Sequence, residues 1–229
     1  MSAGYFITGT DTDVGKTWAT VSLMHYVKQQ GKTVLGMKPV AAGATWRHGQ
    51  LHNADALLLQ QHSSCQVAYE LINPYVYEQA VSPHIAGKQH PVELNVVFDC
   101  FKKLQAQADV VLVEGAGGWY SPINNQQDNS DLAKKLALPV IIVVAIRLGC
   151  INHAKLSFQA VAQSGLVCAG WLAQCVDATM LNREENIHTI TAALPIPLLG
   201  VMPYTPQADF AFFAEQIDKA ALDLGTFTP

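Results

Sequence analysis

Short apolar runs alternate along the chain with longer segments in which apolar residues recur every three or four positions. The runs predict β-strands at residues 5–7, 32–37, 110–113, 139–146, 166–172 and 197–202. The longer segments predict helices from residue 18 towards Gly31 and at residues 55–61, 92–106, 151–163, 183–194 and 209–222. Strands of continuous Val, Ile and Leu are buried on both faces of a sheet. We therefore expect an α/β fold, a doubly wound and mainly parallel sheet with helices on both faces.

The hydrophobic pattern weakens between residues 41 and 91. Here we expect a loop at residues 41–53 and turns around residues 73–75 and 82–84. Three histidines in this region lack the spacing of metal ligands and are interpreted as ordinary loop residues: His48, His52 and His62. Because no linker, repeat or low-complexity tract interrupts the chain, residues 1–229 are predicted to form one domain.

The stretch from Gly9 to Thr17 joins the first predicted strand to the first predicted helix and ends in Gly-Lys-Thr. This context is typical of a phosphate-binding loop, and it specifies the fold as that of a P-loop NTPase. Backbone N–H groups of such a loop bind anionic oxygens together with the helix N-terminus. Lys16 would place a positive charge on the β- and γ-phosphates, and the Thr17 hydroxyl would bind Mg²⁺.

Two features distinguish this loop from the common pattern. Five residues instead of four separate Gly9 from Gly15, and two of them, Asp11 and Asp13, are acidic. Carboxylates there would repel the γ-phosphate unless they face a cation, either the metal or a positively charged second substrate. In the alternative interpretation Asp13 is a helix N-cap and Asp11 a turn residue.

Two further charged residues follow predicted strands. Lys38 comes after the strand at residues 32–37, and Glu114 comes between the strand at residues 110–113 and a run of glycines. In an open parallel sheet, ligands bind at the carboxyl ends of the strands. We therefore expect Lys38 beside the phosphate loop and Glu114 as a Mg²⁺ ligand. A solvated lysine at a strand end is the alternative for Lys38.

Composition excludes several classes of function. The formal charge of −4 gives no electrostatic signal for nucleic acid. The longest apolar run, residues 138–146, is much shorter than the ~20 residues that cross a bilayer. No basic leader with an apolar segment opens the sequence, and five cysteines are scattered without a C-x-x-C pair. We expect a cytoplasmic protein that binds neither nucleic acid nor membrane.

Taken together, the motifs resemble those of the dethiobiotin synthetase family, whose phosphate loop has the same five-residue spacing. The resemblance covers most of the chain and rests on residues 8–17, 38–41, 53–57, 73–75, 82–84, 113–119, 149–154 and 169–171. It implies an ATP-dependent ligase of biotin biosynthesis. Such an enzyme adds CO₂ to 7,8-diaminopelargonic acid and closes a ring to give dethiobiotin, ADP and phosphate.

The resemblance also implies roles for individual residues. Lys16 and Lys38 would be catalytic, and Mg²⁺ would be held by Thr17, Asp55 and Glu114. ATP would be bound by Asp13, Val14, Gly15, Lys16, Thr17, Trp18, Asp55, Glu114, Gly115, Ala116, Gly117, Gln174, Cys175, Pro203, Tyr204 and Thr205. The diamine would contact Thr12, Asp13, Ala42, Gly149, Cys150 and Asn152. The last three would approach the substrate of a neighbouring subunit, which implies a homodimer.

The chain departs from the family pattern at a few positions. Ala42 stands where a substrate-contacting Ser is frequent, and Arg147 stands where some relatives have Lys. Gln174 replaces the Asn that reads adenine, and Cys175 follows where Asp is common. These changes bear on the substrate contact and on nucleotide selectivity, but they leave every predicted metal ligand and phosphate lysine in place.

Two other functions compete with the ligase. A P-loop ATPase switch that acts on DNA or membranes usually carries an additional lysine early in the loop, and residues 10–14 contain none. The acidic segment after Asp209 also differs from a basic membrane-binding tail. A degenerate nucleotide-binding paralogue is the second alternative, and the retained charges at Lys16, Lys38 and Glu114 argue against it.

Overall fold

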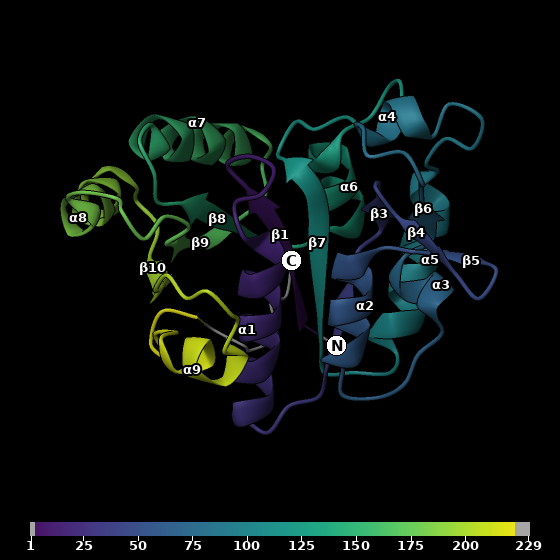
Figure 1. The fold of residues 1–229 in the computed structure, drawn as a ribbon, viewed down its shortest axis with the longest axis horizontal. Helices are drawn as coiled ribbons and strands as arrows, with labels where there is room; N and C mark the ends of the chain where they lie inside the picture. The colour runs from purple at the N-terminus through teal and green to yellow at the C-terminus, as the bar shows by residue number, and fades with distance from the viewer. Residues whose placement is uncertain (1–2, 223–229) are drawn as a thin grey trace.

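A parallel sheet of six strands forms the centre of the computed structural model, which describes residues 3–222 (Figure 1). The strand order is β10-β9-β8-β1-β7-β2, and every neighbouring pair is parallel. Their bounds are β1 Ala3–Gly9, β2 Val34–Met37, β7 Val110–Gly118, β8 Val140–Ala145, β9 Cys168–Gln174 and β10 Leu198–Met202. Strand β1 lies between β7 and β8, so the loop that follows β1 starts at the point where the strand order reverses.

Helices cover both faces of this sheet (Figure 1). The side chains of α1 (Lys16–Gln29) and α9 (Phe210–Glu215) pack in one buried cluster, and α2 (Ala54–Gln61) adds Leu59 to it. The opposite cluster contains side chains of α5 Leu94–Gln105, α6 Asn129–Leu136, α7 Cys150–Gln163 and α8 Arg183–Ala193. The predicted fold class is therefore confirmed.

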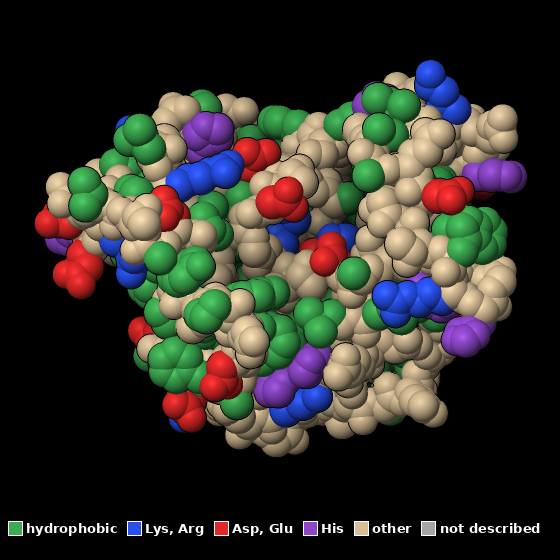
Figure 2. Space-filling model, in the orientation of Figure 1, with side chains coloured by type: hydrophobic (Ala, Val, Ile, Leu, Met, Phe, Trp, Pro, Cys, Tyr) green, Lys and Arg blue, Asp and Glu red, His purple; other side chains and the backbone are tan. Residues whose placement is uncertain are grey.

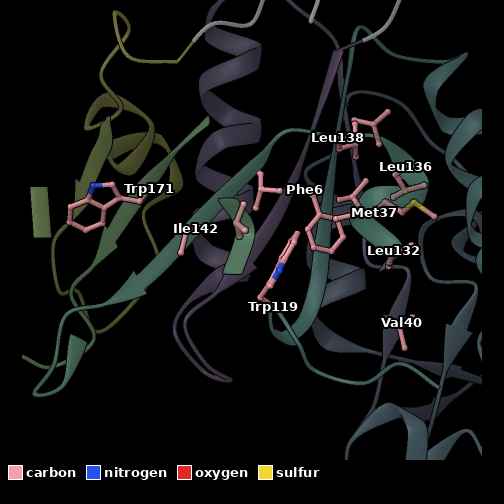
Figure 3. Close-up of a cluster of buried hydrophobic side chains, with 14 of the residues drawn as sticks. Phe6, Met37, Val40, Trp119, Leu132, Leu136, Leu138, Ile142 and Trp171 are labelled. Carbon is pink, nitrogen blue, oxygen red and sulfur yellow. The ribbon is translucent and has the colours of Figure 1, made fainter. Parts of the chain in front are cut away.

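Strand β8 shows why the central runs are wholly apolar. Ile141 and Val143 belong to the cluster on the α1 side of the sheet, whereas Ile142 and Val144 belong to the cluster on the other side. Figure 3 shows Ile142 within the latter cluster. All four are fully buried. Because successive side chains of a strand point to opposite faces, a strand covered on both sides has no polar position.

The region of weak pattern contains small elements that the sequence did not predict. The expected loop at residues 41–53 includes a hairpin of β4 (Thr45–Arg47) and β5 (Gln50–His52). Strand β3 (Val40–Ala41) pairs in parallel with β6 (Tyr75–Val76). Two four-residue helices complete the region, α3 Tyr69–Ile72 and α4 Pro83–Ala86. Elements this short carry too few residues to show a period of their own.

Two expectations about the helices need correction. Helix α6 was missed, although Asp128 and Asp131 form a capping box at its N-terminus. The predicted helix at residues 209–222 ends at Glu215. The chain then pairs with the edge strand β10, where Ile217 bridges to Gly200 and Asp218 N donates to Leu199 O at 2.8 Å. Pairing with a sheet edge requires extended backbone, which ends the helix.

No helix among residues 3–222 combines the length and the apolar character of a membrane span. The prediction of one domain over residues 1–229 stays a prediction, because both ends of that range lie outside the described residues.

Candidate active site

Three cavities follow one another along the carboxyl ends of the central strands, and Figure 2 shows acidic and basic side chains gathered in a hollow of this face. The first has a volume of about 210 Å³ and is lined by Asp13, Gly15, Trp18, Gln174, Cys175, Val176, Tyr204 and Thr205. The second, of about 300 Å³, contains Lys16, Thr17 and Glu114. The third, of about 650 Å³, contains Ala42, Ser82 and Ser121. Neighbouring cavities share lining residues, so they form one continuous site.

The phosphate loop between β1 and α1 is held in its shape by left-handed backbone. Gly15 has φ +85° and is the N-cap of α1, and Asp13 has φ +55°. The alternative interpretation of Asp13 as the N-cap is therefore wrong. The Asp13 side chain lines all three cavities. Lys16 Nζ donates to the carbonyl oxygen of Asp11 at 2.9 Å, which keeps the lysine folded over the loop.

The carboxylate of Asp11 binds away from this lining. Its Oδ2 pairs with Arg147 Nη2 at 2.8 Å, and its Oδ1 accepts from the backbone N–H of Thr12 at 2.7 Å. Asp11 thus links the loop to the end of β8 and does not line the three cavities.

A buried charge cluster occupies the second cavity. Lys38 Nζ donates to Glu114 Oε1 at 2.5 Å and to Asp55 Oδ2 at 3.0 Å. The Thr17 hydroxyl donates to the same Glu114 oxygen at 2.9 Å. Glu114 is fully buried and Lys38 is 5% exposed, so the alternative of a solvated strand-end lysine is wrong. The sheet has brought together residues from β7, the end of β2, and the first turns of α1 and α2.

The charges in this cluster shift one another's pKa values. Burial lowers the pKa of Lys38, but the carboxylates of Glu114 and Asp55 outweigh burial and raise it, so Lys38 remains an ammonium. Burial and the charge of Lys38 lower the pKa of Lys16 to about 8. Burial raises the pKa of Asp55, but the charge and hydrogen bond of Lys38, the hydrogen bond of Thr17 and the charge of Lys16 together outweigh burial and lower it. An anion that binds between the two lysines would relieve their mutual repulsion.

The oxygen atoms at this site fit Mg²⁺. Glu114 Oε2 is buried and has no hydrogen-bond partner among the described residues, while the Thr17 hydroxyl and Asp55 lie beside it. Hydroxyl and carboxylate oxygens are the ligands of a hard cation. Residues 3–222 contain no group of three or more His, Cys, Asp or Glu side chains arranged for a metal. A Mg²⁺ ion here would take further ligands from phosphate and water, as this ion commonly does.

Gln174 is one of the residues that line the first cavity. Its side chain is buried, and its Oε1 has no hydrogen-bond partner within the described part of the chain. The phosphate loop packs on it so closely that a Cβ at Gly15 would lie 2.6 Å from Gln174 Cγ. Trp18 and Tyr204 stand at the sides of this cavity. A nucleobase in this cavity would lie beside two aromatic side chains and near an amide oxygen that has no hydrogen-bond partner among the described residues.

Several predicted residues do not line the three cavities. Val14 is buried beneath the loop, and Pro203 precedes the lining residue Tyr204. Gly149 is the N-cap of α7, where Cys150 is buried against Asn186 with Sγ and Oδ1 3.7 Å apart. Asn152 is exposed on the same helix. The predicted contact of these α7 residues with a neighbouring subunit stays a prediction.

The sequence reasoning missed two asparagines that position the site. Asn129 Nδ2 donates to Ala116 O at 2.7 Å and to Gly118 O at 2.8 Å, which fixes the glycine run after Glu114. Asn73 Nδ2 donates to Lys38 O at 2.7 Å and so fixes the backbone of the lysine. The capping pattern of α6 could have placed Asn129 in a helix, but no sequence signal indicates which carbonyls it binds.

Comparison with known proteins identifies the family. Residues 3–211 match the family model described as an AAA domain. The chain is 44% identical over 215 residues to the ATP-dependent dethiobiotin synthetase of Aromatoleum aromaticum, which covers 93% of this chain and 96% of that protein. The chain belongs to the dethiobiotin synthetase family. The dethiobiotin synthetase of Pseudomonas aeruginosa is 42% identical over 224 residues, covering 96% of this chain and 98% of that protein.

Solved structures give the same fold at much lower identity. The septum site-determining protein MinD of Pyrococcus horikoshii matches with a TM-score of 0.57 and 18% identity, covering 96% of this chain and 98% of that one. A ParA family ATPase of Chlorobium tepidum matches with a TM-score of 0.58 and 12% identity, covering 90% and 86%. At these identities the likeness extends to the fold alone. It adds nothing in favour of an ATPase switch over the dethiobiotin synthetase family.

Proposed function

We propose that the protein joins CO₂ to 7,8-diaminopelargonic acid at the cost of ATP and closes the ureido ring of dethiobiotin, releasing ADP and phosphate. One observation carries this proposal. Lys38, Asp13, Thr12, Asp55 and Gly117 line both the 300 Å³ cavity beside the phosphate loop and the 650 Å³ cavity beyond it. A nucleotide in the first two cavities and a diamine in the third would meet at these residues.

The phosphate end of the site is built for a polyanion. Backbone N–H groups of the loop and the ammonium of Lys16 would bind the β- and γ-phosphates, with the base beside Trp18 and Gln174. Thr17, Asp55 and Glu114 would hold Mg²⁺, which neutralises phosphate charge when it is bound. The pKa of Lys16 is lowered to about 8, so its ammonium still predominates at pH 7. A bound phosphate would favour this charged form further.

The diamine end carries the complementary charge. Asp13 is exposed and lines the 650 Å³ cavity, so its carboxylate is available to a cation there. A substrate ammonium would supply the cation that this carboxylate needs beside the phosphates. Ala42 offers no hydroxyl to this cavity, whereas Thr12, Ser82 and Ser121 do.

The steps of the proposed reaction are those that membership of the dethiobiotin synthetase family implies. One amine of the substrate loses a proton and takes up CO₂ as a carbamate. The carbamate oxygen attacks the γ-phosphorus and ADP leaves, which gives a mixed carbamic-phosphoric anhydride. The second amine attacks the carbonyl carbon, closes the ring and expels phosphate. Lys38, held between the two cavities, stabilises the negative charge that develops on carbamate and phosphoryl oxygens.

The proposal includes a homodimer in the cytoplasm. Leu148 is 95% exposed directly before Gly149, and Leu156 of α7 is 56% exposed. Large apolar side chains of this kind are commonly covered by a subunit interface. The five free cysteines are typical of a reducing compartment. Sedimentation of the purified chain measures the subunit number.

The direct test of the proposed reaction uses ¹³C-labelled bicarbonate with ATP, Mg²⁺ and the diamine. The expected product carries the label in a ureido carbonyl, which ¹³C NMR and a mass increase report. A protein that binds ATP but forms no labelled ureido product would instead be the degenerate paralogue.

A further inference from the structure

Two histidines far apart in sequence meet on the α1 side of the sheet. His25 of α1 and His62, the C-cap residue of α2, place Nε2 and Nδ1 2.9 Å apart, with ring centroids 5.0 Å apart. Phe210 of α9 packs against both, with its centroid 5.0 Å from His62 and 6.1 Å from His25. His62 is thus part of a pair and not an ordinary loop histidine. No sequence pattern indicates this contact, because the two histidines are 37 positions apart in the chain.

The positions of the two nitrogens suit one metal ion. Transition metals bind imidazole nitrogen at ~2.0–2.1 Å, and two such bonds at a right angle place their nitrogens about 2.9 Å apart. His25 Nε2 and His62 Nδ1 already have this separation. Both side chains are half-buried, so each ring retains an exposed side and can turn about its Cβ–Cγ bond. At this contact one ring donates a hydrogen bond to the other. The donor ring must move its proton to its other nitrogen before both facing lone pairs can bind a metal.

The chemistry of the pair selects the class of metal. Imidazole nitrogens prefer first-row transition metals over Mg²⁺ and Ca²⁺, and right-angle pairs of nitrogen ligands suit Cu²⁺ and Ni²⁺. Two charged residues act on His25 in opposite senses: Asp209, which caps α9, and Lys28. We propose that His25 and His62 form a second metal site, separate from the Mg²⁺ site, for a dication of the Cu²⁺ or Ni²⁺ class with water as its remaining ligands.

The site has a physical connection to the nucleotide cavity. Phe210 also contacts Trp18, edge to face, with centroids 6.4 Å apart. Trp18 lines the cavity of about 210 Å³ beside Gln174. An ion that fixes His25 against His62 would restrain Phe210 and therefore the packing around Trp18. Quenching of tryptophan emission by Ni²⁺ gives a second readout of binding besides heat.

The test uses untagged, EDTA-treated full-length protein in excess Mg²⁺, which saturates the oxygen site of Thr17 and Glu114. Isothermal titration with Ni²⁺ should reveal one equivalent that His25→Gln and His62→Gln each weaken by about tenfold or more, because each removes one of two ligands. His188→Gln is the matched control, since His188 is an exposed helical histidine of α8. It should bind like the wild type.

A spectroscopic measurement on the wild type tests the site even if the variants fail to fold. With one equivalent of Cu²⁺, electron paramagnetic resonance should show hyperfine splitting from two imidazole nitrogens, lost in either variant. A spectrum with fewer than two nitrogens, or Ni²⁺ affinities equal in wild type and both variants, would overturn the site and leave only a hydrogen bond between two helices.

Discussion

At the scale of single residues, Lys38 carries two functions at once. Its ammonium neutralises the fully buried Glu114 and the partly exposed Asp55, and it also stands at the junction of the two substrate cavities. The first function is structural, because a buried carboxylate without a partner is costly. The second is the chemical function that we propose, because in the proposed reaction charge would develop where the cavities meet. A substitution at Lys38 therefore changes both stability and rate.

We predict that Lys38→Ala lowers kcat by a factor that corresponds to ~3 kcal/mol or more of transition-state stabilisation. From the sequence alone we would expect the fold to be untouched. The contact with Glu114 instead predicts a loss of stability of about 3–5 kcal/mol, because one partner of a buried pair is removed. Steady-state kinetics and thermal unfolding measure the two effects. Lys38→Ala/Glu114→Gln should regain stability without regaining turnover, and a variant with half the wild-type rate would contradict the catalytic role.

We predict that Asp13→Asn raises the KM for the diamine much more than the KM for ATP. The reason is that Asp13 is exposed and lines the proposed diamine cavity. The matched control is Asp11→Asn, which breaks an exposed ion pair with Arg147 and should cost only about 0–1 kcal/mol. Equal changes in both KM values for Asp13→Asn would exclude an ammonium partner.

We predict that Gln174 makes the protein discriminate less strongly between ATP and other nucleoside triphosphates. Gln presents the same amide groups as the Asn that it replaces but loses more rotamer freedom when fixed, and its neighbour Cys175 is a weak hydrogen-bonding partner. A lost amide contact lowers base discrimination by ~1–3 kcal/mol. We expect kcat/KM for GTP or CTP within about a hundredfold of that for ATP. A larger preference for ATP would show that Gln174 reads adenine fully, and Gln174→Asn is the reference variant.

At the scale of elements, helix α6 supports the glycine run that follows Glu114. Its first residue, Asn129, is fully buried and donates to two carbonyl groups of β7. The capping box of Asp128 and Asp131 fixes the start of the helix and hence the position of Asn129. The cap of one helix thereby sets the backbone that lines the diamine cavity at Ala116 and Gly117.

We predict that Asn129→Ala destabilises the fold and weakens diamine binding. Ala116 O and Gly118 O, both part-buried, lose the Asn129 donor, although Gly118 O still accepts from the backbone N–H of Ser121. The expected cost is therefore that of one unsatisfied group, about 1–3 kcal/mol. Denaturant unfolding and the KM for the diamine report the two effects. Asn125→Ala, at an exposed loop position, is the control and should change neither. A variant of Asn129 with unaltered stability would contradict the anchoring role.

The elements also show how far the sequence could predict the structure. Central strands follow from apolar runs because burial on both faces permits no polar residue, and Lys38 and Glu114 follow from their places at strand ends. Asp55 is assigned to the site only by the family resemblance, because the irregular segment before α2 gives no periodicity from which its position next to Lys38 could be predicted. The end of α9 depends on pairing with β10, a contact between elements that local periodicity does not record.

At the scale of the whole molecule, the parallel sheet gathers distant residues into one linear site. Thr12, Lys38, Asp55, Glu114 and Gln174 come from five separate segments, and all lie along the carboxyl ends of the strands. The three cavities follow one another in the order of the proposed nucleobase pocket, the phosphate pocket and the larger pocket. In the proposed reaction, cleavage of ATP in the second cavity depends on a carbamate presented from the third.

Release of ADP under four conditions tests this claim most directly: with both diaminopelargonate and bicarbonate, with each alone, and with neither. The arrangement of the cavities predicts rapid release only when both are present, because the attacking oxygen belongs to the carbamate that they form. ADP release that proceeds at the same rate whether or not the diamine and bicarbonate are added would contradict the account.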